Sequence, residues 1–154
     1  MTTSVGIVMG SSSDMPVMQK AGDVLDRFGI GYEIEVMSAH RSPERVTEYA
    51  RTAEERGLRV VIAGAGLAAH LPGVVAAHTT LPVVGVPLYQ DALGGADALY
   101  SCVQMPPGVP VATVAIGGAK NAAILAAQIV ATADDALRER LRAFKAELAG
   151  GAKV

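Results

Sequence analysis

Two short polar segments carry the side chains best suited to chemistry. The first, GSSSD at residues 10–14, places Ser11, Ser13 and Asp14 between an apolar run and a stretch that opens with Pro16. A proline there is typical of the first turn of a helix, whose free N–H groups and positive dipole end attract anions. A helix cap alone would also explain Ser13 or Asp14. Because one cap does not need three serines, the pattern favours phosphate binding.

The second segment, MSAHRSPE at residues 37–44, puts a histidine beside an arginine. Arg41 offers a charged fork of N–H donors that suits phosphate or carboxylate, and His40 can donate or accept a proton near neutral pH. The simpler alternative is a surface histidine next to an Arg41–Glu44 ion pair. The serine segment nearby in the predicted fold favours the functional interpretation.

A third segment, AGAGLAAHLPG at residues 63–73, has almost no side-chain bulk before His70. Gly64, Ala65 and Gly66 would let the backbone approach a ligand closely, and free N–H groups there could hold an anion or a molecule as small as CO2. The alternative is that these small residues only permit tight packing of a helix on a sheet. Nothing in the sequence places His78 at a site.

The elements around these segments predict a parallel sheet. Continuous apolar runs at 5–9, 59–66, 82–87 and 109–117, and an alternating run at 32–38, indicate about five strands. Helical stretches follow them, including residues 15–29 and 42–56. We therefore predict a three-layer α/β fold, Rossmann-like or flavodoxin-like. In such folds ligands bind beyond the carboxyl ends of the strands, which brings the three segments together.

Composition narrows the function further. The 154 residues suit one domain, 1–154, and a net charge of −2 without a long basic run argues against a nucleic-acid surface. One cysteine, Cys102, and no secretion signal predict a cytoplasmic protein, and no apolar stretch is long enough for a membrane span. We expect no metal, because the three histidines and Cys102 form no zinc pattern, and no cofactor, because the dinucleotide and P-loop fingerprints are missing.

An amphipathic helix is predicted at about 133–149. Leu137, Leu141, Phe144 and Leu148 form one apolar stripe, and charged residues fill the other faces. The stripe could pack on its own domain or on a neighbouring subunit. A helix appended after the last strand–helix unit favours an oligomer.

Taken together, the motifs resemble the N5-carboxyaminoimidazole ribonucleotide mutase family of purine biosynthesis. The similarity runs from about Val5 to Thr132 and rests on MGSSSD, SAHRSPE, IAGAGLAAHLPG, GVP, YSCVQMPPGVPVATVAIG and AKNAAILAAQI in this order. It implies a flavodoxin-like sheet, a homo-octamer, and rearrangement of N5-carboxyaminoimidazole ribonucleotide to the 4-carboxy isomer without a metal or cofactor. Leu67 departs from the family motif, which has glycine there.

The resemblance also implies the residues of the site. The matching positions are Ser11, Ser13 and Asp14 in the first loop, Ser38, Ala39, His40 and Arg41 in the second, and Ala65, Gly66, His70 and Leu71 in the third. Ser13 and Arg41 would hold the 5′-phosphate, and Asp14 would accept hydrogen bonds from ribose hydroxyls. His40 would carry the proton, and His70 would position the carboxylate or CO2.

Two alternatives remain open. A related carboxylase would take free CO2 and aminoimidazole ribonucleotide directly, although AAHLPG resembles the mutase branch more. A non-catalytic module that binds a phosphoribosyl ligand would need the serines and Arg41 and would not need His40.

Overall fold

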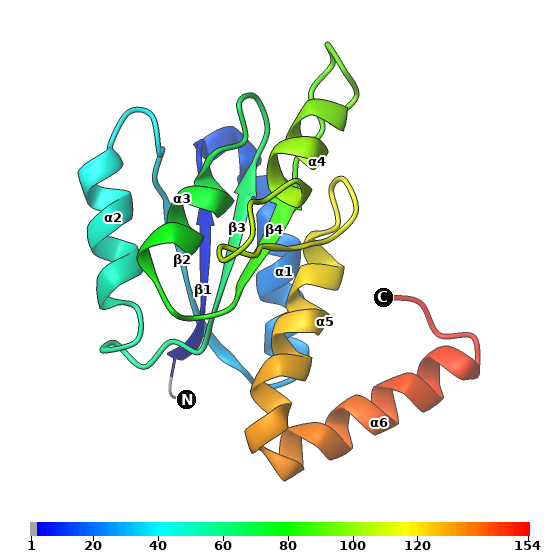
Figure 1. Cartoon of the computed structure of the whole chain (residues 1–154). Helices are drawn as coiled ribbons and strands as arrows, with labels where there is room; N and C mark the ends of the chain where they lie inside the picture. The colour runs from blue at the N-terminus through cyan, green and yellow to red at the C-terminus, as the bar shows by residue number, and fades with distance from the viewer. Residues whose placement is uncertain (1–2) are drawn as a thin grey trace.

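A five-stranded parallel sheet forms the centre of the computed structural model, which describes residues 3–154 (Figure 1). The strands are β1 (Thr3–Met9), β2 (Gly31–Val36), β3 (Val60–Ala65), β4 (Val83–Pro87) and β5 (Ala112–Thr113). Their spatial order is β2-β1-β3-β4-β5, and every neighbouring pair is parallel. This is the flavodoxin-like order rather than the Rossmann one, and its topological switch point lies between β1 and β3.

Helices cover both faces of the sheet. They are α1 (Met15–Arg27), α2 (Pro43–Thr52), α3 (Leu71–His78), α4 (Ala96–Val103), α5 (Ala119–Val130) and α6 (Asp135–Ala149), with short 3₁₀ turns at Ser12–Asp14 and Ala131–Ala133. One core lies between the sheet and α1, α5 and α6, and a second lies between the sheet and α2, α3 and α4. The predicted three-layer α/β fold is therefore confirmed.

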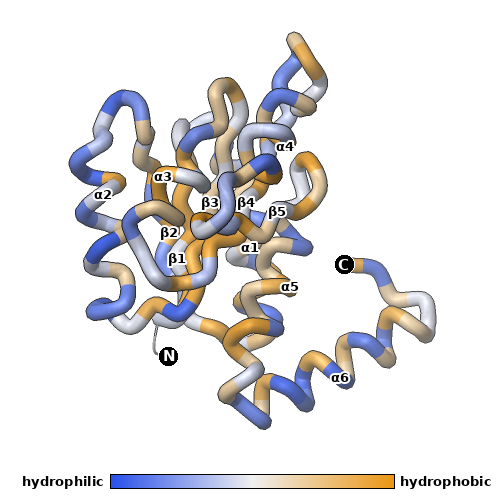
Figure 2. Tube along the Cα trace, in the orientation of Figure 1, coloured by the Kyte–Doolittle hydropathy of each residue, from blue (hydrophilic) through white to orange (hydrophobic). Residues whose placement is uncertain are grey.

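The inner strands are buried on both faces. Ile7 of β1 packs into the core with α1 and α5, and the next residue, Val8, packs into the core with α2 and α3. All residues of β3 and β4 are buried, as expected for continuous apolar runs in a parallel sheet. Figure 2 shows the same pattern as hydrophobic colour along the central strands.

Two predicted elements are shorter than expected. The apolar run 109–117 forms only the two-residue strand β5, and Ala112 is exposed, so the run is not a fully buried strand. Helix α2 ends at Thr52 rather than near Arg56. Residues after Thr52 form turns in which the Leu58 N–H donates to the Ala53 carbonyl, and Gly57 has a φ of +91°.

The apolar stripe of α6 packs within the chain. Leu137, Leu141 and Phe144 are buried, and the ring of Phe144 meets Phe28 edge-on with centroids 5.3 Å apart. Leu148 contacts the same core at its edge. The stripe therefore has its partner in this chain, and it does not support the expected oligomer.

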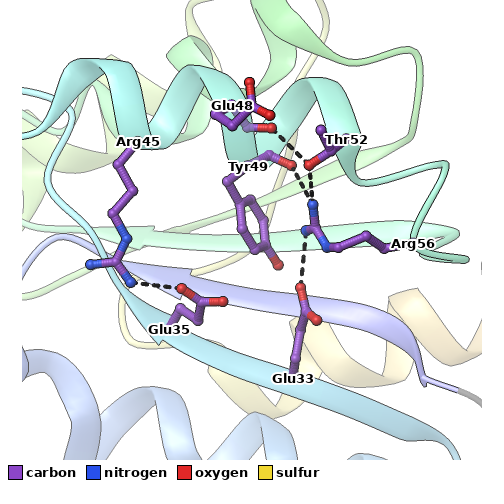
Figure 3. A network of polar contacts seen from close by, with 7 residues as sticks. All are labelled: Glu33, Glu35, Arg45, Glu48, Tyr49, Thr52 and Arg56. Atoms are coloured by element: carbon purple, nitrogen blue, oxygen red, sulfur yellow. Dashed lines mark hydrogen bonds and ion pairs between the residues drawn. The ribbon is translucent and has the colours of Figure 1, made fainter.

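A polar network fastens α2 to the edge strand β2 (Figure 3). Arg56, just after α2, binds the carboxylate of Glu33 at 3.1 Å and stacks over the ring of Tyr49, 4.5 Å from its centroid. Arg45 on the first turns of α2 pairs with Glu35 at 2.7 Å. Because α2 begins directly after the MSAHRS segment, this attachment fixes one end of the second loop.

Candidate functional site

A cavity of about 220 Å³ lies at the carboxyl edge of the sheet. Its walls come from the loops after β1, β2, β3 and β4: Gly10, Ser11, Ser13, Asp14, Ser38, Ala39, His40, Arg41, Ala65, Gly66, Leu67, Ala68, Leu71 and Gln90. All the residues proposed for the site from the sequence line this cavity except His70. The three predicted loops thus line one cavity at the carboxyl edge, where the switch-point rule for parallel sheets places a ligand.

In the first loop the serines interact with each other. Ser11 precedes the 3₁₀ turn, and its Oγ accepts hydrogen bonds from the backbone N–H of Ser13 at 3.3 Å and from the Ser13 hydroxyl at 2.9 Å. Ser11 is therefore the cap of this turn, whereas the Asp14 side chain, at the N-cap of α1, forms no capping hydrogen bond. Both hydroxyls belong to the cavity wall, where they can rotate toward an anion.

Asp14 lies at the start of α1 and lines the same wall. Burial raises the pKa of its carboxyl above the ordinary 3.8, and the backbone hydrogen bond to Ser11 works in the opposite direction. A carboxylate that has lost part of its hydration is well suited to accept hydrogen bonds from a ligand hydroxyl.

The second loop is a tight turn organised by Ser38. The Ser38 Oγ accepts from the backbone N–H groups of His40 and Arg41, both at 3.3 Å, and the Ser38 carbonyl accepts from the Ser42 N–H at 2.9 Å. Arg41 is exposed, and it forms no side-chain ion pair or hydrogen bond within residues 3–154, so the pairing with Glu44 is not formed. The guanidinium is free to bind an anion.

The third loop carries the one non-glycine residue with positive φ in the described chain, Ala68 at +44°. This region is uncommon for residues with a Cβ, and such strain concentrates at functional sites. Gly64 serves packing instead, because a Cβ there would lie 2.4 Å from the sulfur of Met18 in the core. In this loop Ala65 and Gly66 line the cavity, whereas Gly64 does not.

His40 and His70 form a pair. The Nε2 of His40 lies 2.7 Å from the Nδ1 of His70, and the rings meet at 78° with centroids 4.8 Å apart. One of these nitrogens donates and the other accepts, so the contact holds a single hydrogen between the rings. His70 therefore reaches the site through His40, since it does not line the cavity itself. His78, at the end of α3, is not part of the wall.

Gln90 was missed by sequence reasoning. It follows β4, the fourth strand, and the available signal was its place at the same edge of the sheet as the other loops. Leu67 also lines the wall, yet it is 67% exposed and therefore does not fill the cavity.

Within residues 3–154, no three His, Cys, Asp or Glu side chains gather where they could hold a metal ion. The helices of this described part are also too short or too polar to cross a membrane.

Fold and site together define a flavodoxin-like α/β protein with a polar cavity at the switch point, where a free arginine and a histidine pair meet. Residues 4–150 match the family model described as AIR carboxylase. The chain therefore belongs to the AIR carboxylase family.

Curated relatives carry a more specific name. A protein of Pyrococcus abyssi named N5-carboxyaminoimidazole ribonucleotide mutase is 59% identical over 144 residues, which cover 94% of this chain and 83% of that protein. A protein of the same name from Vibrio vulnificus is 59% identical over 93% of this chain and 90% of its own length. The crystal structure of PurE from Treponema denticola superimposes with a TM-score of 0.86 at 34% identity, covering 95% of this chain and 91% of that one.

Proposed function

We propose that this protein converts N5-carboxyaminoimidazole ribonucleotide to 4-carboxyaminoimidazole ribonucleotide in purine biosynthesis. The supporting observation is one cavity whose wall contains two serine hydroxyls, an unpaired arginine and a histidine, in a chain 59% identical to a protein named for this reaction. An anion site beside a proton carrier is what a phosphorylated substrate and a proton-dependent rearrangement require.

The ligand is oriented by charge. The guanidinium of Arg41 and the hydroxyls of Ser11 and Ser13 bind the 5′-phosphate at the start of the α1 region, where the positive end of the helix dipole adds to the attraction. Asp14 accepts hydrogen bonds from the ribose, since a carboxylate repels phosphate. The imidazole end then extends toward Ala65, Gly66 and Leu71.

His40 moves the proton. Protonation of the carbamate nitrogen breaks the bond to its carboxyl carbon and releases CO2, which leaves an electron-rich aminoimidazole. C4 of the ring attacks the same CO2, and the hydrogen on C4 must then leave to restore aromaticity. One group that gives the first proton and accepts the second balances the reaction, and His40 has the chemistry for both steps.

Ser38, Ala39 and His70 support His40. The Ser38 hydroxyl shapes the turn on which His40 sits, with Ala39 as the small residue of that turn, and the ring of His70 fixes the orientation of His40 by their 2.7 Å contact. The small residues of the third loop enclose the released CO2, so that it is recaptured before it is diluted into solvent.

The test is a comparison of two substrate mixtures. Purified protein should form the 4-carboxy product from N5-carboxyaminoimidazole ribonucleotide at low bicarbonate, and much more slowly from aminoimidazole ribonucleotide with bicarbonate. The family description as AIR carboxylase makes direct carboxylation the second candidate, and faster product formation from the second mixture would favour it. No product from either mixture would indicate a binding module.

We further propose a cytoplasmic homo-octamer. Cys102 is a buried free thiol whose pKa burial raises to about 11, which agrees with a reducing compartment in which no disulfide is needed. Large apolar side chains are exposed along residues 89–103, where Tyr89, Leu93 and Tyr100 are each more than 60% exposed, and this surface suits contact between copies. Light scattering that gives the mass of a monomer would contradict the assembly.

A further inference from the structure

Gln90 places a side-chain amide in the wall of the cavity. Beyond the end of β4, the Leu88 N–H donates to the Ala65 carbonyl at 2.9 Å, so the chain after β4 stays beside the third loop. Gln90 is half-buried and lines the cavity together with Ala65 and Gly66 of the third loop. Its position thus belongs to the imidazole end of the proposed binding mode.

The side chain of Gln90 fills the space that a Cβ of residue 66 would need. A Cβ added to Gly66 would be 2.5 Å from the Gln90 Nε2 and 3.1 Å from both its Cδ and its Cγ. The φ of Gly66 is outside the left-handed region, so the glycine is needed for this close approach and not for its backbone conformation. Gly66 and Gln90 therefore act as one unit.

The Gln90 amide has no hydrogen-bond partner among the described residues. Within residues 3–154, neither Nε2 nor Oε1 of Gln90 takes part in a hydrogen bond, although its backbone carbonyl accepts from the Gly94 N–H at 2.9 Å. The amide of Gln90 still reaches solvent, so a ligand that supplies a donor and an acceptor would replace its water contacts. An amide presents a donor and an acceptor side by side, so its best partner does the same.

We propose that Gln90 recognises the carboxylate and the adjacent N–H of the ligand's imidazole end, an inference that rests on the proposed function. In the substrate these groups form the carbamate, and in the product they are the 4-carboxylate and the neighbouring amine. Nε2 donates to the carboxylate, and Oε1 accepts from the N–H. The phosphate is a poorer partner for Gln90 because it offers acceptors only and has Arg41 available.

The test uses Gln90→Met, which keeps the length of the side chain and removes its hydrogen bonds, and Gln90→Glu, which replaces the donor with a negative charge. We expect Gln90→Met to raise KM and the dissociation constant of 4-carboxyaminoimidazole ribonucleotide by about 10- to 100-fold, the range for the loss of a hydrogen bond to a charged carboxylate. Gln90→Glu should raise both by more than Gln90→Met does. Calorimetry with ribose 5-phosphate should show no change in either variant.

Gln104→Met is the matched control, because Gln104 is exposed and does not line the cavity. If the wild-type protein converts the substrate and Gln90→Met leaves KM and product affinity unchanged, this inference is overturned and the proposed function stands. Weaker binding of ribose 5-phosphate in Gln90→Met would also overturn it. A wild-type protein that neither binds nor converts the ribonucleotide overturns both.

A double-mutant cycle separates recognition from general damage to the loop. Gly66→Ala should displace the amide and weaken product binding to about the extent of Gln90→Ala, because the three atoms nearest to the new methyl group all belong to Gln90. In the Gln90→Ala background the same change should have little further effect. If the losses of product affinity in the two single variants add up fully in the double variant, the two residues do not act together. Gly66 would then not be needed to place the Gln90 amide.

Discussion

At the scale of single residues, His40 carries the strongest prediction. His40→Asn preserves a similar size and a hydrogen bond but cannot transfer a proton, so conversion should fall by roughly 10²- to 10⁴-fold while product still binds. His70→Asn should cost less, because His70 touches His40 and does not line the cavity. Turnover and calorimetric binding of the product measure both. Near-normal turnover in His40→Asn with an inactive His70→Asn would reverse the assignment.

Arg41 should act on binding rather than on the chemical step. Its guanidinium is exposed and unpaired within the described chain, and its proposed phosphate contact is far from the migrating carboxylate. We expect Arg41→Ala to raise KM by about 10- to 100-fold, the range for a lost hydrogen bond to a charged group, with a small change in kcat. A collapse of kcat at unchanged KM in steady-state kinetics would place Arg41 at the reacting end.

Asp14 should make the protein less stable near neutral pH. Because burial raises the pKa of Asp14, the folded state binds the carboxyl proton more tightly than the unfolded state does. The free energy of unfolding therefore falls as pH rises from the ordinary pKa of 3.8 to the raised pKa of the folded state. Asp14→Asn should therefore raise the melting temperature at pH 7, and the gain should disappear below the ordinary pKa of 3.8.

The same substitution should weaken ribonucleotide binding, since the amide replaces one of the acceptor oxygens with a donor.

The stability prediction is contradicted if the difference in melting temperature between Asp14→Asn and wild type is the same at pH 7 and at pH 3, because burial of the carboxylate would then not destabilise the fold. Thermal unfolding followed at several pH values decides this.

At the scale of elements, the attachment of α2 to β2 contains one unsatisfied group. Tyr49 is 6% exposed, and its hydroxyl has no hydrogen-bond partner within the described residues. Burial, and then the nearby Glu33 carboxylate, raise the pKa of Tyr49 above its usual 10.0. Tyr49→Phe keeps the ring under Arg56 and removes the unpaired hydroxyl, so it should stabilise the fold by about 1 kcal/mol.

Denaturant unfolding of Tyr49→Phe checks this, with Tyr100→Phe as the control because that ring is exposed. A loss of stability of 1 kcal/mol or more would mean that the Tyr49 hydroxyl has a partner, for which Glu33 is the nearest candidate. The site should be unaffected, since Tyr49 lies outside the cavity wall.

Comparison of the predicted and observed elements shows which parts of the fold the sequence predicts. β3 and β4 were predictable because a parallel strand buried on both faces needs a continuous apolar run. β5 was overestimated, since an apolar run does not reveal how many of its residues pair with a neighbour. The stripe on α6 was visible, but its partner Phe28 ends a helix far away in the sequence, so the packing could not be foreseen.

At the scale of the whole molecule, topology explains most of the site. Once β1, β2 and β3 were known to be parallel, the loops after them had to meet at one edge, and residues as distant as Ser13 and Arg41 entered one cavity. Gln90 was missed because its loop, residues 88–95, contains no serine, histidine or arginine that would indicate a site. The contact between His40 and His70 depends on ring positions within fractions of an ångström, which no sequence pattern specifies.

In the proposed reaction, the carboxyl group moves within one bound molecule through trapped CO2. N5-carboxyaminoimidazole ribonucleotide labelled with ¹³C in its carboxyl group should be converted in a single turnover, in unlabelled bicarbonate, and the product examined by mass spectrometry. We expect the 4-carboxyl group to retain the label, because CO2 held against the third loop reacts before it escapes. A product that carries carbon from the bicarbonate would contradict it, since the carboxyl group would then have passed through solvent.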